Sequence, residues 1–258
     1  MPFVFAAGFG AGLLGGLLGI GGGIVMMPVL RFALGLDAPM AAGTCVTAVV
    51  FTTLAGAVRH AGMGQVRLRP ILPIVMWGAA STAAFSLAFP WLARGHSRWL
   101  DLGVGAAFLL ISGRMILEGC LESAEETVAM PAGMADRGWH LPAIGIAAGA
   151  LPGLLGIGTG AILVPAFVYL RGWPMKVAIG SSLSCFFPLA FLSACFKAAQ
   201  GHVDARAAVM LGIGAVAGSV MGASLTRYAR ASWLKAAFGV LFLYVAFQYV
   251  RLFFEVPS

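Results

Sequence analysis

Charged residues are nearly absent from long stretches of this chain, and this feature limits its possible folds more than any other. They make up 10% of the 258 residues, whereas 60% of the residues are hydrophobic. A soluble domain carries about 25% charged residues, so this chain cannot cover a water-facing surface with polar side chains. The sequence therefore predicts an all-α polytopic membrane protein surrounded by the lipid bilayer.

Ten apolar runs follow one another along the chain, five on each side of a polar linker. The linker contains Glu122, Glu125 and Glu126, whose carboxylates require water. We expect a first transmembrane repeat over residues 1–118, a polar cytoplasmic linker over 119–140 and a second transmembrane repeat over 141–258. The runs cover residues 3–18, 24–36, 41–58, 71–92, 100–117, 141–155, 161–170, 177–196, 207–228 and 234–250.

The two halves of the chain repeat one sequence pattern. When residues 8–30 are aligned with residues 145–167, a shift of 137, twelve of the 23 positions are identical without a gap. The match includes two glycine clusters, GIGGG at 19–23 and GIGTG at 156–160, and it aligns Pro28 with Pro165. The pattern indicates one fold that is duplicated within the chain.

The first two runs of each half are too short to cross a bilayer. A helix over residues 3–18 reaches about 24 Å, whereas the hydrocarbon core is roughly 30 Å thick. Because both runs flank a glycine cluster, we expect a re-entrant helix hairpin in each half, with the glycines at its buried tip. The other three runs of each half then form three transmembrane helices.

Three full crossings in each half place the second repeat upside down relative to the first. With inverted repeats, 10 of the 16 lysines and arginines lie on one side of the membrane and 6 on the other. Parallel repeats would split them 8 to 8. Positive charge marks the cytoplasmic side, so the bias favours inverted repeats with the linker in the cytoplasm and both termini outside.

The two glycine clusters form the candidate substrate site. Each opens a short helix, and a helix start presents unpaired backbone N–H groups and the positive end of the helix dipole. Two such starts from inverted repeats would meet near the middle of the membrane and could hold an anion. Tight helix packing is the alternative explanation of these glycines. The candidate substrate-binding residues here are Gly19, Gly21, Gly22, Gly23, Gly156, Gly158, Thr159 and Gly160.

Small hydroxyl residues begin the third run of each half. Thr44 and Thr47 in the first half correspond to Ser181 and Ser184 in the second. We expect these hydroxyls to donate hydrogen bonds to an oxyanion. The alternative is that each hydroxyl bonds to the backbone of its own helix.

Two cationic residues end the same runs. We expect Arg59 and Lys197 to lie at a vestibule, where they attract anions without entering the site. The alternative is that they anchor helix ends at the membrane interface. No acidic residue and no clear fixed cation lies mid-span, so we expect the site itself to consist of neutral donors.

Other functions lack support in the sequence. The basic residues fall singly, without the basic patch interleaved with aromatic residues that is typical of nucleic-acid binding. The four histidines stand alone at loop ends, and neither a metal-ligand spacing nor a Walker A loop is present. An enzyme would need a charged or nucleophilic dyad at membrane depth. We therefore expect no nucleic-acid partner, no metal, no cofactor and no enzymatic activity.

The duplicated GLLGIGGG element with its following proline resembles the TauE/SafE sulfite exporter family over nearly the whole chain. The resemblance implies transport of sulfite, thiosulfate, sulfonates such as sulfoacetate, or other small organic anions, mostly in prokaryotic inner membranes. It extends to residues 19–23, Pro28, residues 156–160 and Pro165 of this chain. Thr159 replaces the Gly22 of the first half, and we expect this difference to set the orientation of the substrate.

We therefore expect a secondary transporter that moves a small sulfur-containing anion across the inner membrane by alternating access between the halves. An anion channel is the alternative within transport, and a membrane-embedded enzyme is the alternative from another class. The sequence leaves open the identity of the anion, the direction of transport, the coupling ion and the oligomeric state, for which a homo-oligomer is one option.

Overall fold

The computed structural model of the chain describes residues 2–93, 140–156 and 158–229, and six single residues between 239 and 251. Every regular element in these residues is a helix. The chain divides into two compact units, one formed by residues 1–89 and 127–228 and the other by residues 90–126 and 229–258. The helices below belong to the first unit, apart from the last four residues of α4. The expected fifth and tenth helices lie largely outside the described residues.

The observed helices follow the apolar runs of the sequence. In the first half, α1 covers Pro2–Leu18, α2 covers Gly23–Pro28, α3 covers Ala38–Gly62 and α4 covers Leu68–Ala93. In the second half, α6 covers His140–Leu155, α7 covers Gly160–Pro165, α8 covers Met175–Ala199 and α9 covers Ala205–Thr226. Helices α3, α4, α8 and α9 are long and apolar enough to cross a membrane, whereas α1 and α6 are shorter. The prediction of a helical, multi-pass membrane protein is confirmed.

Aspartate side chains begin two of the long helices. Asp37 accepts a hydrogen bond of 3.1 Å from the backbone N–H of Met40 at the start of α3. Asp204 accepts bonds of 3.0 Å from the N–H groups of Arg206 and Ala207 at the start of α9. Each carboxylate satisfies donors that the first helical turn leaves unpaired, so these caps define where the two spans begin.

A proline changes the geometry of each short helix after a glycine cluster. At Pro28, α2 passes into a π-helical turn, η1, which covers Val29–Ala33. At Pro165, α7 passes into η2, which covers Ala166–Leu170. Proline has no N–H group for the regular helical bond, and the wider turn accommodates this loss. The two prolines that the sequence aligns therefore occupy the same local geometry.

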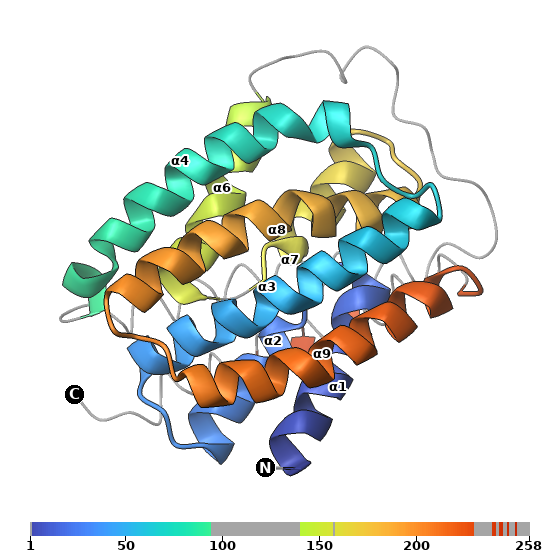
Figure 1. The fold of residues 1–258 in the computed structure, drawn as a ribbon. Coiled ribbons are helices and arrows are strands. Elements are labelled where there is room, and N and C mark those ends of the chain that lie inside the picture. The colour runs from blue at the N-terminus through green and yellow to red at the C-terminus, as the bar shows by residue number, and fades with distance from the viewer. Residues whose placement is uncertain are drawn as a thin grey trace. The chain divides into compact units, whose positions relative to one another are not determined.

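The four long helices lie side by side in the order α4, α8, α3, α9 (Figure 1). Gly78 of α4 lies against Leu189 of α8, and α3 contacts both α8 and α9. The short helices pack against this row. Helix α1 packs on α9 and α6 packs on α4, whereas α2 contacts α3 and α7 contacts α8. Each end of the row therefore carries a first helix that comes from the other half of the chain.

Glycines bring α1 and α9 into backbone contact. A Cβ atom added to Gly12 would lie 2.6 Å from the Cα atom of Ala215, which is closer than real side chains approach. Small residues allow this approach in membrane bundles, where close packing replaces the hydrophobic effect as the source of stability. The same kind of contact pairs Gly8 with Leu211 and Gly16 with Ser219 on one side, and Gly218 with Phe9 on the other.

Helices α6 and α4 meet in the same way. A Cβ atom on Gly149 would overlap with the backbone of Gly78. Two hydrogen bonds add to this contact, because Ser81 donates to the Ile146 carbonyl at 2.8 Å and Thr82 donates to the Gly149 carbonyl at 3.0 Å. The two halves of the chain are therefore joined at both ends of the row by glycine-lined contacts.

Replacing Gly12 by alanine should destabilise the protein, because the new methyl group would overlap with the Ala215 backbone and push α1 away from α9. Overpacking of this kind costs about 1–3 kcal/mol. The expected result is a lower unfolding temperature of the purified protein in detergent. Gly10→Ala is the matched control, because a Cβ atom at Gly10 of the same helix meets nothing within 4 Å. Equal unfolding temperatures for the two variants would contradict the packing assigned to Gly12.

Candidate functional site

Left-handed backbone angles explain the glycines of the first cluster. Residues 19–23 are here named the first tip, and residues 156–160 the second tip. Between α1 and α2 the chain turns through Gly19, Gly21 and Gly22, whose φ angles are 76°, 75° and 77°. Glycine adopts such angles without steric cost. At the second tip Gly156 has a φ of 67°, whereas Thr159 is right-handed with a φ of −82°. The difference between Gly22 and Thr159 in the sequence therefore corresponds to a difference in backbone conformation.

The two tips pack directly against each other. A Cβ atom on Gly158 would overlap with the carbonyl of Ile20, and one on Gly160 would overlap with the carbonyl of Gly19. From the first tip, a Cβ atom on Gly23 would lie 3.1 Å from the backbone nitrogen of Gly158. The two glycine clusters thus meet at one place. Close packing, the alternative explanation of these glycines, accounts for Gly158 and Gly160 in this conformation.

Thr159 carries an unpartnered hydroxyl at this meeting point. Its side chain is fully buried, and its Oγ1 atom has no hydrogen-bond partner among the described residues. It precedes the first residue of α7 but does not cap that helix with its side chain. A buried hydroxyl without a partner costs about 1–3 kcal/mol, so such groups are uncommon. Thr159 is therefore free to donate a hydrogen bond to a bound molecule.

Two of the four predicted hydroxyls bond to their own helices. Thr47 donates to the carbonyl of Gly43 at 2.8 Å. Ser184 donates to the carbonyl of Gly180 at 3.0 Å. Both residues lie one helical turn after the carbonyl that they bond, a common arrangement for hydroxyls within helices. In this conformation Thr47 and Ser184 therefore take the helix-bonded arrangement, which was the alternative to oxyanion binding.

The other two hydroxyls hold loops. Thr44 of α3 accepts a bond of 2.9 Å from the backbone N–H of Asp204, in the loop that follows α8. Ser181 of α8 accepts a bond of 3.0 Å from the backbone N–H of Arg67, in the loop that follows α3. Each hydroxyl thus fixes a loop of the opposite half of the chain, a structural role that was not predicted from the sequence.

Two neighbouring residues that were not in the predicted site tie the long helices to the first tip. Ser182 of α8 donates a bond of 2.8 Å to the carbonyl of Gly19. Cys45 of α3 donates a bond of 3.4 Å from its thiol to the carbonyl of Gly23. Both belong to the small polar runs that contain Thr44 and Ser181, so the pattern contained a signal for them. The sequence could not tell which member of each run faces the tip.

Arg59 and Lys197 occupy different surroundings. Arg59 is exposed, and its Nε atom donates a bond of 2.9 Å to the hydroxyl of Ser224. Lys197 is fully buried, with its Nζ atom 3.3 Å from the centroid of the Phe89 ring. In this conformation Lys197 is therefore enclosed by protein, whereas Arg59 reaches the surface. Its burial comes from the end of α4, which is distant in sequence and covers the end of α8.

Carboxylates are rare in this unit. Residues 2–93, 140–156 and 158–229 contain only Asp37 and Asp204, and both cap helices. Within these ranges no group of three or more His, Cys, Asp or Glu residues could hold a metal ion. The donors at the tips are therefore hydroxyl, thiol and backbone groups, which suit an acceptor-rich anion better than a cation.

The sequence matches the family described as Sulfite exporter TauE/SafE over residues 4–249. It is 27% identical over 248 residues to the probable membrane transporter protein YunE of Bacillus subtilis, covering 88% of this chain and 89% of that relative. It is 28% identical over 255 residues to a probable membrane transporter protein of Xylella fastidiosa, covering 93% of this chain and 89% of that relative. No solved structure matches the chain.

These matches are to transporters and not to enzymes, and they extend over most of the chain. Four helices of the structure are long and apolar enough to cross a membrane. The resemblance first seen in the duplicated glycine clusters is confirmed. The chain belongs to the TauE/SafE sulfite exporter family and is a multi-pass membrane transporter.

Proposed function

We propose that the protein is a secondary transporter that moves a small sulfur-containing anion across the inner membrane by alternating access. The anion is sulfite, thiosulfate or an organosulfonate such as sulfoacetate. The observation that carries this proposal is the meeting of the two hairpin tips beside the unpartnered hydroxyl of Thr159. Neither α2 nor α7 has a side-chain cap, so no capping side chain occupies the start of either helix, where an anion would approach.

The chemistry of the tips supports the choice of substrate class. Backbone N–H groups and hydroxyls favour a compact anion with several acceptor oxygens, and sulfite, thiosulfate and sulfonates have this form. A cation would need oxygen ligands to replace its hydration shell. The tips contain no carboxylate, and the carbonyls of Gly19 and Gly23 already accept bonds from Ser182 and Cys45. The description of the matched family, which names sulfite, agrees with this chemistry.

Paired contacts support an arrangement of two inverted repeats, residues 1–118 and 141–258, joined by a cytoplasmic linker over residues 119–140. Gly12 packs on Ala215, and after a shift of 137 the same contact joins Gly149 to Gly78. A two-fold relation between the halves would produce such exchanged pairs. Rocking of one half against the other would then open the tip contact alternately to each side of the membrane.

Flux into proteoliposomes tests the proposed function. Purified protein should take up at least one of radiolabelled sulfite, thiosulfate and sulfoacetate with saturation kinetics. Unlabelled substrate inside the vesicles should accelerate this uptake, because a transporter exchanges its substrate between two states. Uptake without saturation or exchange would indicate an anion channel. Movement of Na⁺ or Ni²⁺ without any sulfur anion would refute the proposal.

Removing the hydroxyl of Thr159 should weaken substrate binding. Thr159→Val preserves the volume of the side chain but removes its donor, and a hydrogen bond to a charged group is worth about 1.5–3 kcal/mol. We expect KM for the transported anion to rise roughly tenfold to a hundredfold. Thr52→Val is the matched control, because the Thr52 hydroxyl is also buried and donates to the Ala48 carbonyl of its own helix at 3.4 Å. Equal KM values for both variants would exclude Thr159 from the site.

The proposed topology places Cys120, at the edge of the acidic linker, on the cytoplasmic side. Cys120 lies outside the described residues, and of the other cysteines Cys45 and Cys185 are buried whereas Cys195 is exposed. With these three cysteines replaced by alanine, an impermeant thiol reagent should label inside-out vesicles and leave intact cells unlabelled. Labelling of intact cells would overturn the orientation.

A further inference from the structure

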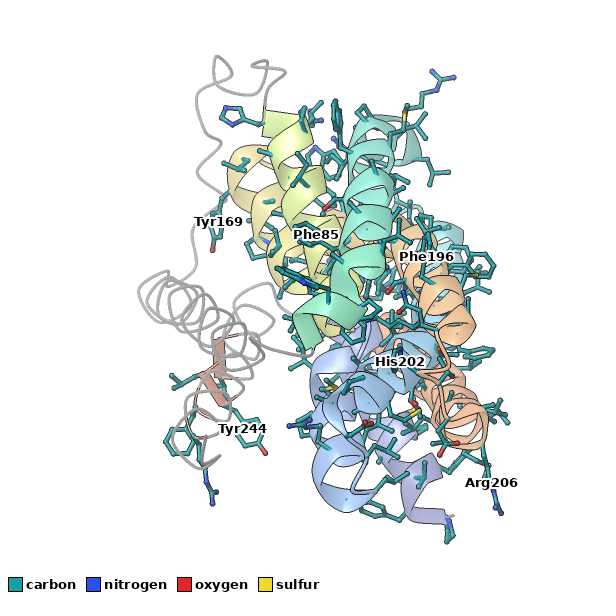
Figure 2. All side chains as sticks on the ribbon, turned by 90° about the vertical axis from the view of Figure 1, so that its left-hand side faces the viewer. Phe85, Tyr169, Phe196, His202, Arg206 and Tyr244 are labelled. Carbon is teal, nitrogen blue, oxygen red and sulfur yellow. The ribbon has the colours of Figure 1, made fainter. Side chains whose placement is uncertain are left out.

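The ends of α4 and α8 enclose a group of polar side chains that includes Lys197, Ser86 and His202, here named the Lys197 cluster. The Nζ atom of Lys197, the Oγ atom of Ser86 and the Nδ1 atom of His202 are buried and have no hydrogen-bond partner in the described part of the chain. The acceptor oxygen of Gln200 is also unpartnered there. In Figure 2, His202 lies among the packed helices, whereas Arg206 extends from their edge.

One turn of α4 brings these groups together. The Phe89 ring lies 3.3 Å from the Lys197 Nζ atom and packs edge-on against the His202 ring, with a centroid distance of 5.7 Å. Ser86 lies one turn earlier on the same face of α4. Its carbonyl accepts a bond of 2.8 Å from the side-chain nitrogen of Gln200. Polar side chains from both halves of the chain therefore gather around this turn of α4.

The charge of Lys197 lacks a counter-charge within the described residues. The two carboxylates there, Asp37 and Asp204, accept bonds from backbone N–H groups at helix starts, and neither forms an ion pair with Lys197. A buried ammonium is strongly unfavourable unless it is paired and hydrogen-bonded. The contact with the Phe89 ring compensates part of this cost but supplies no negative charge. A bound anion would supply both the charge and the acceptors.

The matching position of the first half contains no unsatisfied polar side chain. A shift of 137 places Lys197 on His60 and His202 on Gln65. The two ring nitrogens of His60 are both bonded, one to the Gly16 carbonyl at 3.0 Å and the other to the Gln65 side chain at 2.7 Å. The first half therefore satisfies its polar groups internally, whereas the second half has unsatisfied donors. The fold alone does not require these donors to be unsatisfied.

The cluster lies next to the hairpin tips. Cys45 donates its thiol to the carbonyl of Gly23 at the first tip. The backbone of Gly43, half a turn earlier in α3, packs against the carbonyl of His202. The start of α3 therefore contacts both the first tip and the loop that carries His202.

We infer that the Lys197 cluster binds the charged group of the transported anion directly, with the Lys197 ammonium as counter-charge and the Ser86 hydroxyl as a donor. This inference rests on the proposed function and adds a fixed cation to a site that the sequence indicated to consist of neutral donors. In the present conformation the Phe89 ring covers the ammonium. The ring moves aside when an anion oxygen takes its place against Nζ.

Lys197→Met tests this inference, with Lys176→Met as the control. Both variants remove one lysine charge from α8, but Lys176 lies at the other end, where it donates to the Arg227 carbonyl at 2.8 Å. We expect Lys197→Met to raise KM for sulfite, thiosulfate or sulfoacetate roughly tenfold to a hundredfold, whereas Lys176→Met leaves KM unchanged. The effect should persist at high chloride concentration, because a buried contact is little screened. An effect that disappears at high salt would assign Lys197 to a vestibule and overturn the inference.

Thermal unfolding in detergent separates binding from a purely structural role. The wild-type protein should be stabilised by the transported anion, and Lys197→Met should lose this stabilisation. Without the anion, Lys197→Met should unfold at the same temperature as the wild type or higher, because methionine places an apolar chain against Phe89. A lower unfolding temperature with an unchanged KM would make Lys197 structural and overturn the inference.

A second variant keeps the test decisive if Lys197→Met does not fold. Ser86→Ala removes only one buried hydroxyl oxygen and should raise KM severalfold. An unchanged KM for Ser86→Ala would then overturn the inference.

The proposed function and the role of the cluster fail differently, because a wild-type protein that transports none of the anions refutes the proposed function. Transport by the wild type with an unchanged KM in Lys197→Met refutes only the role of the cluster.

Discussion

Direct contact between helix backbones is the constraint on which this structure depends. Lipid chains are as apolar as the side chains that face them, so helices gain little by burying apolar surface against one another. Dispersion between closely approaching atoms must supply the stability, and it decreases steeply when a gap opens. Glycine makes the approach possible where α1 meets α9, where α6 meets α4, and where Gly158 meets Ile20 between the tips.

Much of the helical framework could be predicted from the sequence, because apolar runs and turn residues mark helix limits locally. The apolar run at 41–58, for example, corresponds to the helix Ala38–Gly62, which begins earlier because Asp37 caps it. The π-helical turns after Pro28 and Pro165 were not predicted, because proline signals a break without specifying its form. The meeting of the two glycine clusters was predicted from two inverted repeats whose helix starts reach the middle of the membrane.

The candidate site was less accessible to prediction, because its side chains find partners far away in the sequence. Thr44 bonds to Asp204, 160 residues later. The position of Lys197 near the end of an apolar run indicated an interfacial residue. In the structure Lys197 is covered by Phe89 of the other half, and the pattern of residues within α8 cannot predict this contact. A sequence pattern shows which residues share a helix face, but packing decides what that face meets.

Differences between the duplicated halves are as informative as their identity. Thr159 replaces Gly22 at one tip, and Lys197 replaces His60 at the end of one long helix. Both replacements introduce a buried polar group without a partner in the described residues, whereas the corresponding position of the first half is either a glycine or fully bonded. Glycine contacts join the two halves, and these two differences between the halves add polar groups that no described partner satisfies.

The exchange of first helices between the halves has a consequence for biosynthesis. Gly12 of α1 finds its partner in Ala215 of α9, 203 residues later. At about 5–20 residues per second, the ribosome needs roughly 10–40 s to make the intervening chain. During that time α1 remains in the membrane with its glycine face uncovered. The contact between α1 and α9 therefore forms only after most of the chain has been made.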